Sequence, residues 1–422
     1  MIAAAPHTAG SIDARHHGVM EPEVITTDVC VAGGGPAGLM LAVLLARQGV
    51  RVVLLEKHAD FLRDFRGDTV HPSTLDLLDD MGLGDELAEL PHRDVRRMSV
   101  TFADGTFTLA DFGRLRVRHP YIRFMPQWHL LNLLATAGER LPTFTLLRSH
   151  EVTDVLRDRG IVTGVRALGP RGELQVRAYL TVAADGRAST IRDRLDLPMR
   201  AFGAPMDVLW FRLSRRPADN EGLDMHVGAG RLLLAIDRAD YWQIADLIPK
   251  DGDAAIRAAG LDAFRADVAG QAPGLANRVG EITSWDDVKV LAVRVDRLRR
   301  WYAPGVLLIG DAAHAMSPIG GVGINLAVQD AVAAARLLGE PIRQRRLSSR
   351  WLAKVQSRRA FPTVGTQAMQ LAIQRAFLGR VLSSAEPVAA PAPLRLSRRF
   401  PVLQALPARV IGVGLRPERL GR

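Results

Sequence analysis

The chain is poor in cysteine and in aromatic residues. Of its 422 residues one is cysteine, Cys30, and only 5% are Phe, Trp or Tyr. A single cysteine excludes an internal disulfide and a cysteine-based zinc cluster, and we predict no metal site. Cys30 lies in an apolar stretch, where we expect a small buried hydrophobic residue.

The chain also lacks long uninterrupted hydrophobic runs. No stretch of about 18 charge-free apolar residues occurs, so a membrane span is not expected. Residues 1–23 have no basic segment followed by an apolar core, and therefore do not resemble a secretory signal. With 48% hydrophobic and 24% charged residues, the composition is typical of a folded globular protein. We predict a cytoplasmic protein of two or three domains.

Acidic residues are scarce near the C-terminus. Residues 343–422 contain 16 Arg or Lys but only Glu386 and Glu418, a net of +14 against +10 for the whole chain. No zinc-finger, RNA-recognition or helix-turn-helix pattern accompanies this charge, so we predict no nucleic-acid partner. Two interpretations stay open: an arginine-rich helix surface packed on the rest of the chain, or weak peripheral contact with an anionic membrane. The oligomeric state is not predicted.

The pattern along the chain alternates between strands and helices. The apolar run 29–32 breaks into glycines, a helical pattern begins at Pro36, and a second strand follows at 51–56. This order predicts a β-turn-α-β unit. Short strands with turns recur over 150–184, and residues 207–249 are again strand-like, which predicts a second sheet.

A glycine pattern links the first strand to the first helix. Gly33, Gly35 and Gly38 form GxGxxG, which permits a tight turn, close backbone approach to a diphosphate and close helix–strand packing. The start of the helix favours an anion. Glu56, about 20 residues downstream, is placed to accept hydrogen bonds from ribose hydroxyls, with Lys57 beside it. The pattern predicts dinucleotide binding but does not separate NAD from FAD.

Two later segments favour FAD. VAADGRASTIR (182–192) and GVLLIGDAAHAMSPIGGVGINLAVQDA (305–331) resemble the later fingerprints of the p-hydroxybenzoate hydroxylase-like family, the single-component (group A) FAD-dependent aromatic monooxygenases. Together with GGGPAG they follow the family's order at similar separations. The resemblance runs from about Thr26 to about Leu338.

The resemblance implies an α/β fold with α+β elements. We expect a Rossmann-like FAD-binding domain formed by 24–90, 122–198 and 285–340, with an inserted sheet-containing substrate domain formed by 91–121 and 199–284. Residues 341–422 are helical in composition and are predicted to form a C-terminal helical region.

The resemblance also implies individual cofactor contacts. Arg66 matches an arginine that pairs with FAD phosphate, and Gln127 matches a glutamine that contacts the cofactor. Asp185 and Gly186 match a pair near the diphosphate, for which a simple Asp-Gly turn is the alternative.

A third group of expected contacts lies around Gly310 and Asp311. The carboxylate of Asp311, after an apolar strand, can accept a ribityl hydroxyl; a helix-capping aspartate is the alternative. Further on, the N–H groups of Gly323, Ile324 and Asn325 would point out of a helix start. In the family this helix end faces the flavin, and it would stabilise the negative charge of reduced flavin.

The family resemblance implies a reaction. We predict hydroxylation or epoxidation of an apolar, aromatic or polyketide-like small molecule with O₂ and NADH or NADPH, through a flavin C4a-hydroperoxide. Arg187 and Ala188 stand where the family has a histidine for nicotinamide, so the choice of donor stays open. A flavin-dependent reductase of isoprenoid double bonds and a non-catalytic flavin-binding protein are the alternatives.

Few catalytic side chains are expected, because the cofactor carries the oxygen. His71 is the candidate base for activating a phenol, with a histidine at a helix entrance as the alternative, and Pro318 is a second catalytic candidate. Neighbours on a strand point to opposite faces, so at most one of each adjacent aromatic pair should line a substrate pocket. These pocket candidates are Trp210, Phe211, Tyr241 and Trp242.

Overall fold

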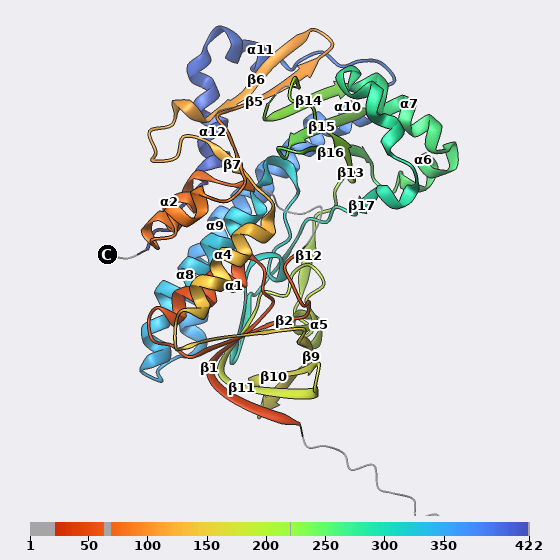
Figure 1. Cartoon of the computed structure of the whole chain (residues 1–422). Coiled ribbons are helices and arrows are strands. Elements are labelled where there is room, and N and C mark those ends of the chain that lie inside the picture. The colour runs from red at the N-terminus through yellow and green to blue at the C-terminus, as the bar shows by residue number, and fades with distance from the viewer. Residues whose placement is uncertain (1–21, 63–68, 220, 421–422) are drawn as a thin grey trace, which may run out of the picture.

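The computed structural model describes residues 22–62, 69–219 and 221–420. Two large sheets lie towards opposite ends of the molecule, with long helices beside and between them (Figure 1). The chain enters the lower sheet of that view first, and it crosses to the upper sheet and returns to the lower one twice before its C-terminal helices.

The lower sheet is built around parallel strands. Its main path, in spatial order, is β19 (Tyr302–Ala303), β20 (Val306–Leu308), β11 (Gly172–Ala183), β1 (Glu23–Ala32), β2 (Val52–Glu56) and β8 (Phe144–Arg148). All these pairings except that of β19 are parallel, so the carboxyl ends of five strands meet at one edge. β9 (Glu151–Asp158) and β10 (Ile161–Gly169) extend from β11 as an antiparallel meander.

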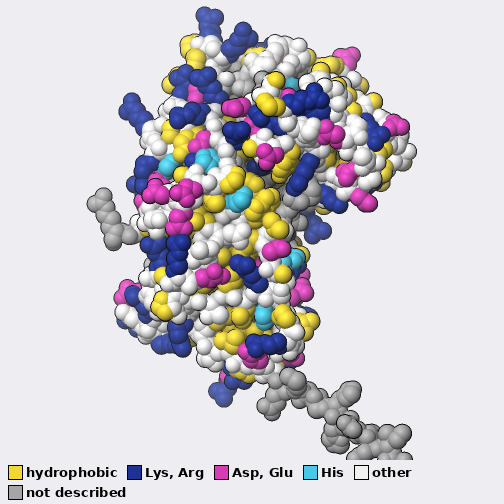
Figure 2. All heavy atoms as spheres, viewed as in Figure 1, with side chains coloured by type: hydrophobic (Ala, Val, Ile, Leu, Met, Phe, Trp, Pro, Cys, Tyr) yellow, Lys and Arg dark blue, Asp and Glu magenta, His cyan; other side chains and the backbone are white. Residues whose placement is uncertain are grey.

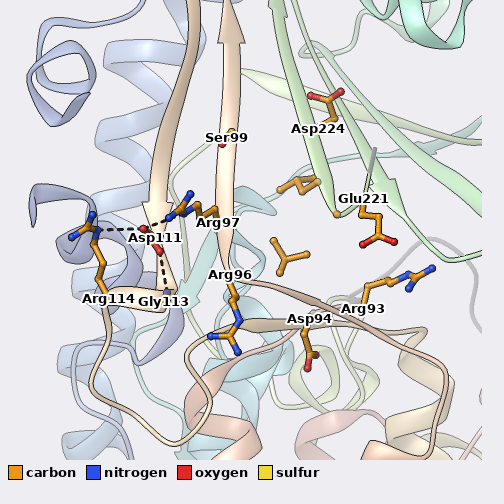
Figure 3. A pocket seen from close by; sticks show the side chains of 13 residues that line it. Arg93, Asp94, Arg96, Arg97, Ser99, Asp111, Gly113, Arg114, Glu221 and Asp224 are labelled. Atoms are coloured by element: carbon orange, nitrogen blue, oxygen red, sulfur yellow. Dashed lines mark hydrogen bonds and ion pairs between the residues drawn. The ribbon is translucent and has the colours of Figure 1, made fainter. Parts of the chain in front are cut away.

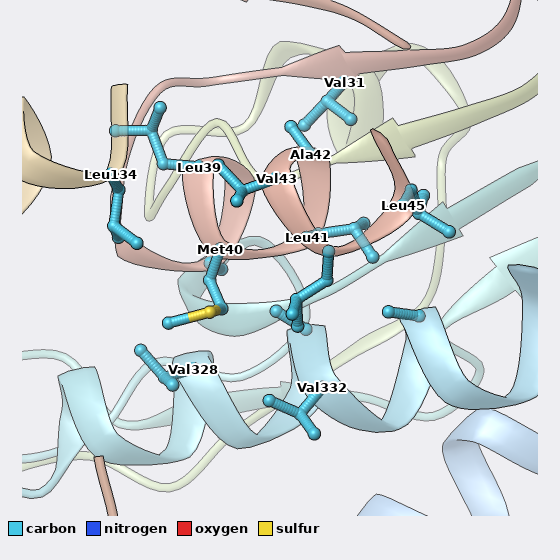
Figure 4. Close-up of a cluster of buried hydrophobic side chains, with 14 of the residues drawn as sticks. Val31, Leu39, Met40, Leu41, Ala42, Val43, Leu45, Leu134, Val328 and Val332 are labelled. Carbon is cyan, nitrogen blue, oxygen red and sulfur yellow. The ribbon is translucent and has the colours of Figure 1, made fainter. Parts of the chain in front are cut away.

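Both faces of the parallel strands are buried. Val29 and Val31 of β1 join a hydrophobic cluster with α1 (Pro36–Ala46), α4 (Gln127–Glu139) and α8 (Gly323–Arg343) (Figure 4). Cys30 and Ala32 point to the other face, which the β9–β10 meander covers. Because α1 lies between the sheet and α8, almost every residue in it is buried, which accounts for its lack of a polar face.

Helix α8 is a core helix. With the turn before it, it is long and apolar enough to cross a membrane by length and composition alone, but 72% of its apolar window is buried inside the fold. It also carries buried Asp330, which is ion-paired to Arg359. The apolar character of α8 therefore reflects packing between α1 and α9 (Ser349–Ile373).

The upper sheet gathers strands from three parts of the chain. In spatial order they are β17 (Lys289–Leu291), β13 (Met206–Ser214), β16 (Tyr241–Pro249), β15 (Arg231–Asp237), β14 (Leu223–Gly228), β5 (Arg97–Phe102) and β6 (Gly105–Asp111). Every pairing is antiparallel except that of β14 with β5. α6 (Asp253–Ala259) and α7 (Leu261–Gln271) lie on the same side of this sheet, and α7 packs on it.

Short elements connect the two sheets. Three antiparallel strands, β3 (Thr69–Val70), β7 (Ile122–Phe124) and β4 (Arg93–Val95), form a small sheet, and β12 (Met199–Ala201) pairs with β18 (Asp296–Leu298) where the chain crosses in both directions. Three short helices also lie outside the two large sheets: α2 (Pro72–Asp80), α3 (Gly84–Ala88) and α5 (Thr190–Arg194).

The C-terminal residues are helical and touch both halves. α9 packs on α8, while α10 (Gly379–Leu382), α11 (Ala392–Arg399) and α12 (Ala405–Gly412) pack on strands β15 and β6 of the upper sheet. Strand β17 lies beyond the boundary expected at residue 284, yet it pairs with β13. The division into three domains at the expected boundaries stays a prediction.

Candidate active site

Three segments that are far apart in the sequence contact one another at the carboxyl edge of the parallel strands. Gly33 has φ +101°, and a Cβ on it would collide with the backbone of Ala184 and Asp185. A Cβ on Gly310 would stand 3.3 Å from the Cβ of Ala37, in the first turn of α1. The glycines of the first and third segments therefore permit the contacts that assemble the site.

The glycine-rich turn has the packing that its spacing predicts. A Cβ on Gly38 would collide with the carbonyl oxygen of Gly33, whereas a Cβ on Gly35 would meet no atom within 4 Å. Gly38 therefore serves helix–strand packing, and the space beside Gly35 is open to a ligand. Pro36 follows as the first residue of α1, a position where its missing N–H costs no helical hydrogen bond.

Glu56 fixes this turn from the end of β2. Its Oε2 accepts a hydrogen bond from the Gly34 N–H at 2.9 Å, and its Oε1 accepts one from the His58 N–H at 3.0 Å. The residue is only 7% exposed, whereas neighbouring Lys57 is exposed. Glu56 thus has a structural task in addition to its expected contact with ribose hydroxyls.

The second segment presents polar atoms that lack protein partners. Asp185 accepts the Ile191 N–H at 3.3 Å through Oδ2, but Oδ1 is buried without a partner among the described residues, and burial raises the pKa of this carboxyl. Nη1 of Arg187 is likewise buried and unpartnered. Gly186, at φ +83°, leaves open space where a Cβ would lie.

These unpaired groups fit FAD. A buried carboxylate oxygen needs a hydroxyl or N–H donor, and a buried guanidinium N–H needs an oxygen acceptor. FAD carries ribityl and ribose hydroxyls next to a diphosphate, so one ligand can satisfy both. Asp311, in the third segment, is partly exposed and accepts the Arg187 Nε–H at 3.0 Å through Oδ2.

The loop before α8 is shaped by two glycines in the left-handed region, Gly320 at φ +76° and Gly321 at φ +64°. The N-cap residue of α8, Val322, makes no capping hydrogen bond with its side chain, so the first N–H groups of the helix lack a capping acceptor among the described residues. The Asn325 side chain is directed elsewhere: its Oδ1 accepts hydrogen bonds from Ser73 at 2.9 Å and Thr74 at 2.8 Å. The Asn325 amide oxygen is thereby occupied, which leaves its backbone N–H and its side-chain NH₂ group as the possible cofactor contacts.

His71 joins three separate elements. It is fully buried at the start of α2, with Nδ1 2.8 Å from the Ile411 carbonyl oxygen of α12 and Nε2 3.1 Å from the Gly321 carbonyl oxygen. Burial lowers its pKa to about 4. This geometry favours the helix-entrance alternative, in which His71 positions the loop before α8, over the predicted catalytic base.

A buried polar network supports the third segment from behind. Asp330 of α8 accepts hydrogen bonds from the Gly310 N–H at 3.2 Å, from His314 Nε2 at 2.6 Å and from Arg359 Nε at 2.9 Å. Although burial raises the pKa of Asp330, His314 and Arg359 hold it below the usual value. Arg359 also pairs with Glu418, so α8, α9 and the C-terminal tail jointly fix Gly310.

Sequence analysis missed this network as a unit. Asp330, Arg359 and Glu418 lie on separate elements, and no spacing in the sequence connects them. The only available signal was that Asp330 falls within an apolar helix pattern, where a carboxylate requires a partner.

Adjacent aromatic residues of the upper sheet point to opposite faces, as strand geometry requires. Phe211 and Trp242 pack in the cluster covered by α7, where the Phe211 ring lies 5.4 Å from the Phe264 ring. Trp210 joins the other cluster, which extends to Ile319 in the loop before α8. Phe211 and Trp242 are therefore not pocket residues on the cofactor-facing side, which corrects two of the four aromatic candidates.

The two remaining aromatic candidates differ in their surroundings. Trp210 is partly buried, and its Nε1 is buried without a partner among the described residues. Tyr241 is the first residue of β16, and the Arg212 guanidinium lies 4.6 Å from its ring centroid. Trp210 is the stronger candidate, because it combines an apolar ring with a free hydrogen-bond donor.

Three further predicted residues carry less structural information. Arg66 lies outside the described residues. Gln127 is the first residue of α4, which packs on α1, and Pro318 precedes the short turn Ile319–Gly321. Their roles in cofactor binding or catalysis stay predictions.

A polar cavity of about 820 Å³ lies between β5 and the start of β14 (Figure 3). Its arginines are partly neutralised by carboxylates, since Arg97 and Arg114 both pair with Asp111, at 3.3 and 3.2 Å. None of the predicted cofactor or substrate residues lines this cavity, so it is separate from the site assembled around α1 and α8.

Comparison with known proteins identifies the family. The model of the FAD binding domain family matches residues 26–370, a range that includes all three cofactor segments. The chain belongs to this family. Among the relatives of this FAD-binding protein is a 6-methylpretetramide 4-monooxygenase from Streptomyces rimosus, 37% identical over 377 residues that cover 86% of this chain and 88% of the relative.

Other comparisons agree with this assignment. An anhydrotetracycline monooxygenase from S. rimosus is 32% identical over 75% of this chain and 63% of its own length. The solved structure of OxyS anhydrotetracycline hydroxylase from the same organism matches with a TM-score of 0.69 and 27% identity, covering 94% of this chain and 78% of that one. The predicted fold class is confirmed.

The chain is therefore an FAD-dependent monooxygenase, and NAD(P)H is the electron donor typical of this family. This confirms the enzyme class and the cofactors predicted from sequence. The alternatives, a reductase of isoprenoid double bonds and a non-catalytic flavin-binding protein, are not supported by these relatives, which are monooxygenases.

Proposed function

We propose that this monooxygenase hydroxylates a fused-ring aromatic, polyketide-like molecule. The substrate's C–H bond would become C–OH, with the second oxygen atom of O₂ released as water and NADH or NADPH oxidised. The observation that carries this proposal is the juxtaposition of three mutually contacting cofactor segments with the apolar cluster of Trp210 and Ile319.

The chain's own residues would bind and orient the reactants. Gly35 and the start of α1 would hold the diphosphate, and Glu56 and Asp311 would accept hydroxyl hydrogen bonds. When bound, FAD supplies hydride acceptance and oxygen activation. The uncapped N–H groups at Gly323 and Ile324 would stabilise negative charge on the flavin, which favours its reduced form.

The chemistry of the cluster around Trp210 supports the substrate class. It presents hydrophobic side chains from both the upper sheet and the loop before α8, which would exclude water from the reacting carbon. The unpartnered Trp210 Nε1 adds one donor, suited to a carbonyl or phenol oxygen. The relatives named for 6-methylpretetramide and anhydrotetracycline support a polycyclic substrate of this kind.

An isotope experiment tests the proposal. Purified protein loaded with FAD is given NADH or NADPH and a panel of tetracyclic phenols, simple phenols and polyprenyl compounds under ¹⁸O₂. We expect one ¹⁸O atom in a hydroxylated polycyclic product, and the rates with the two donors identify the nicotinamide preference. Turnover without label in the product would contradict the proposal, and labelling of simple phenols alone would contradict the substrate class.

We also infer a cytoplasmic location and a weak peripheral membrane contact through the C-terminal region. Part of the positive charge there is neutralised, because Arg358 and Arg359 of α9 both pair with Glu418. That pairing supports the packed-surface alternative for α9. The remaining support for membrane contact comes from exposed apolar residues beside arginines on residues 396–409, near the upper end of Figure 2, where basic side chains are prominent.

A further inference from the structure

Arg187 lies between two of the cofactor segments. It follows the Asp185–Gly186 pair in sequence, and its Nε donates to Asp311 Oδ2 at 3.0 Å. Nη2 donates to the Met316 carbonyl oxygen at 3.4 Å. The third nitrogen, Nη1, is buried and has no partner among the described residues. Two nitrogens of the guanidinium thus bind the third segment, and the third nitrogen remains available to bind a ligand.

The backbone around Arg187 is held in place. Arg192, which is 8% exposed, donates through Nη2 to the Arg187 carbonyl oxygen at 2.7 Å. The Arg192 N–H in turn donates to Ser189 Oγ at 3.1 Å, which caps α5. Because the loop is fixed at these points and the Arg187 side chain is only 26% exposed, its Nη1 does not simply extend into solvent.

The position of this loop indicates the missing partner. Gly33, the first glycine of the turn that would bind a diphosphate, packs directly against Ala184 and Asp185. Asp185 Oδ1 is an unpaired acceptor on the same loop as the unpaired donor Nη1, yet the two do not bond to each other. A ligand with an anionic oxygen near a hydroxyl group would satisfy both atoms, and a dinucleotide has that arrangement.

We propose that Arg187 binds a diphosphate oxygen of a dinucleotide while it holds Asp311 in the orientation that accepts a ribityl hydroxyl. FAD is the expected source of that diphosphate, and NAD(P)H carries the same group. The planar guanidinium suits this double task because its N–H groups point in fixed directions, whereas a lysine ammonium offers one compact charge. This inference rests on the proposed cofactor site.

Flavins of different length separate the phosphate contact from the effect on Asp311. Kd values of FAD, FMN and riboflavin are measured by fluorescence quenching with full-length apoprotein, for the wild type and for Arg187→Gln. Removing a charge-assisted hydrogen bond should raise Kd by a factor of about 10 to 100 for FAD and FMN, which carry phosphate. We expect riboflavin, which lacks phosphate, to change by only about threefold through Asp311.

Two further variants sharpen the result. Arg187→Lys keeps the charge but loses the planar fork, so its FAD affinity should lie between those of the wild type and Arg187→Gln. Arg194→Gln is the matched control: Arg194 is the last residue of α5, the helix that follows the Arg187 loop, and it pairs with Asp154 on the surface, 3.5 Å away. Its flavin affinities should equal those of the wild type, and thermal melting of each apoprotein reports any loss of folding.

Each outcome decides a different point. Unchanged flavin affinity in Arg187→Gln, with weaker binding of NADH or NADPH to the holoenzyme, would support the diphosphate contact and assign it to the nicotinamide cofactor. Equal weakening of all three flavins would overturn the phosphate contact, because Arg187 would then act only through Asp311. No change with any flavin or nicotinamide would also overturn it, whereas a wild type that binds no FAD would contradict the cofactor site itself.

Discussion

The cofactor half and the substrate sheet of this monooxygenase present their functional groups in different ways. In the parallel sheet these groups come from turns after strands, where Gly33 and Gly310 bring backbones into close contact. In the antiparallel sheet the groups come from one face, and Trp210 and Phe211 are separated by strand alternation alone. Glycine spacing is visible in a sequence, but which face meets the cofactor is not.

The largest effect on cofactor binding is expected at Glu56, whose carboxylate also fixes the glycine turn. Glu56→Ala removes the acceptor of the Gly34 and His58 N–H groups and the expected acceptor of ribose hydroxyls. We expect the Kd for FAD to rise about 100-fold or more, and the protein to be purified largely colourless. Glu139→Ala, which removes an exposed carboxylate at the end of α4, is the control. An unchanged Kd in Glu56→Ala would contradict the proposal that FAD binds at the end of β2.

A second prediction concerns reduction, not binding. Ile324→Pro removes one N–H from the first turn of α8, where proline fits without breaking the helix. Loss of a fixed donor in a dry site typically costs about 3 kcal/mol, so reduction by NAD(P)H should slow by about 100-fold and the flavin potential should fall. The FAD affinity should change much less. Ile324→Ala keeps the N–H and should reduce normally; equal rates in both variants would place this helix start away from the flavin.

The third prediction separates the two halves by the direction of their pH dependence. Burial raises the pKa of Asp246 in the substrate sheet to about 7, although Arg231 lies 3.2 Å away. The unfolded chain ionises this group near pH 4, so the folded state loses stability as pH rises from about 4 to 7. Asp246→Asn should abolish that loss, and between pH 5 and 7 its advantage over the wild type should grow by roughly 2 to 3 kcal/mol.

Urea unfolding at pH 5, 6, 7 and 8 measures this difference. Arg231 keeps its 2.8 Å pair with Asp267 in the variant, so the guanidinium is not left unpaired. In the cofactor half, burial lowers the pKa of His71 to about 4, so stability there should fall as pH drops from about 6.5 to 4, the opposite direction. If the difference in unfolding free energy between the wild type and Asp246→Asn did not change with pH, the raised pKa of Asp246 would be contradicted.

The fourth prediction tests the two faces of the substrate sheet. Trp210→Phe keeps an aromatic ring but removes the unpartnered Nε1–H, so KM for the polycyclic substrate should rise about tenfold with little change in stability. Trp242→Phe, on the opposite face, removes the 2.9 Å hydrogen bond to Asp219 and should lower stability while leaving KM unchanged. Steady-state kinetics and thermal melting of both variants check this. A raised KM in Trp242→Phe with an unchanged KM in Trp210→Phe would place the substrate on the opposite face of the sheet.

The smallest effect is expected at the C-terminal surface. Phe400, Val402 and Leu406 are 50%, 70% and 67% exposed, with Arg399 beside them. We expect weak sedimentation with anionic vesicles at low salt, reduced a few-fold by Phe400→Ser with Leu406→Ser. Phe361→Ser, at an exposed position on α9, is the control. Absence of wild-type binding would leave the packed arginine-rich surface as the full account of the basic C-terminus.

The sequence alone indicated a dinucleotide cofactor, because local backbone requirements leave residue patterns, and the resemblance of two later segments to a known family pointed to FAD. Gly33, Gly35 and Gly38 are spaced for a turn, an open approach and helix packing, and the structure gives each glycine the surroundings that this spacing requires. The strand-like runs within 207–249 also became strands β13, β15 and β16, since alternation and turn residues are local signals.

Only the tertiary structure decided which side chains act together. His71 could be a base or a helix-entrance residue until its ring was placed between the carbonyl oxygens of Ile411 and Gly321, more than 200 residues away. Phe211 and Trp242 are aromatic residues in strand-like runs, just as Trp210 is. The pairing of β13 with β16 places them on the opposite face of the sheet, which α7 covers. The unpaired Nη1 of Arg187 depends on contacts with Asp311 and Met316, and such long-range partners leave no periodicity in the sequence.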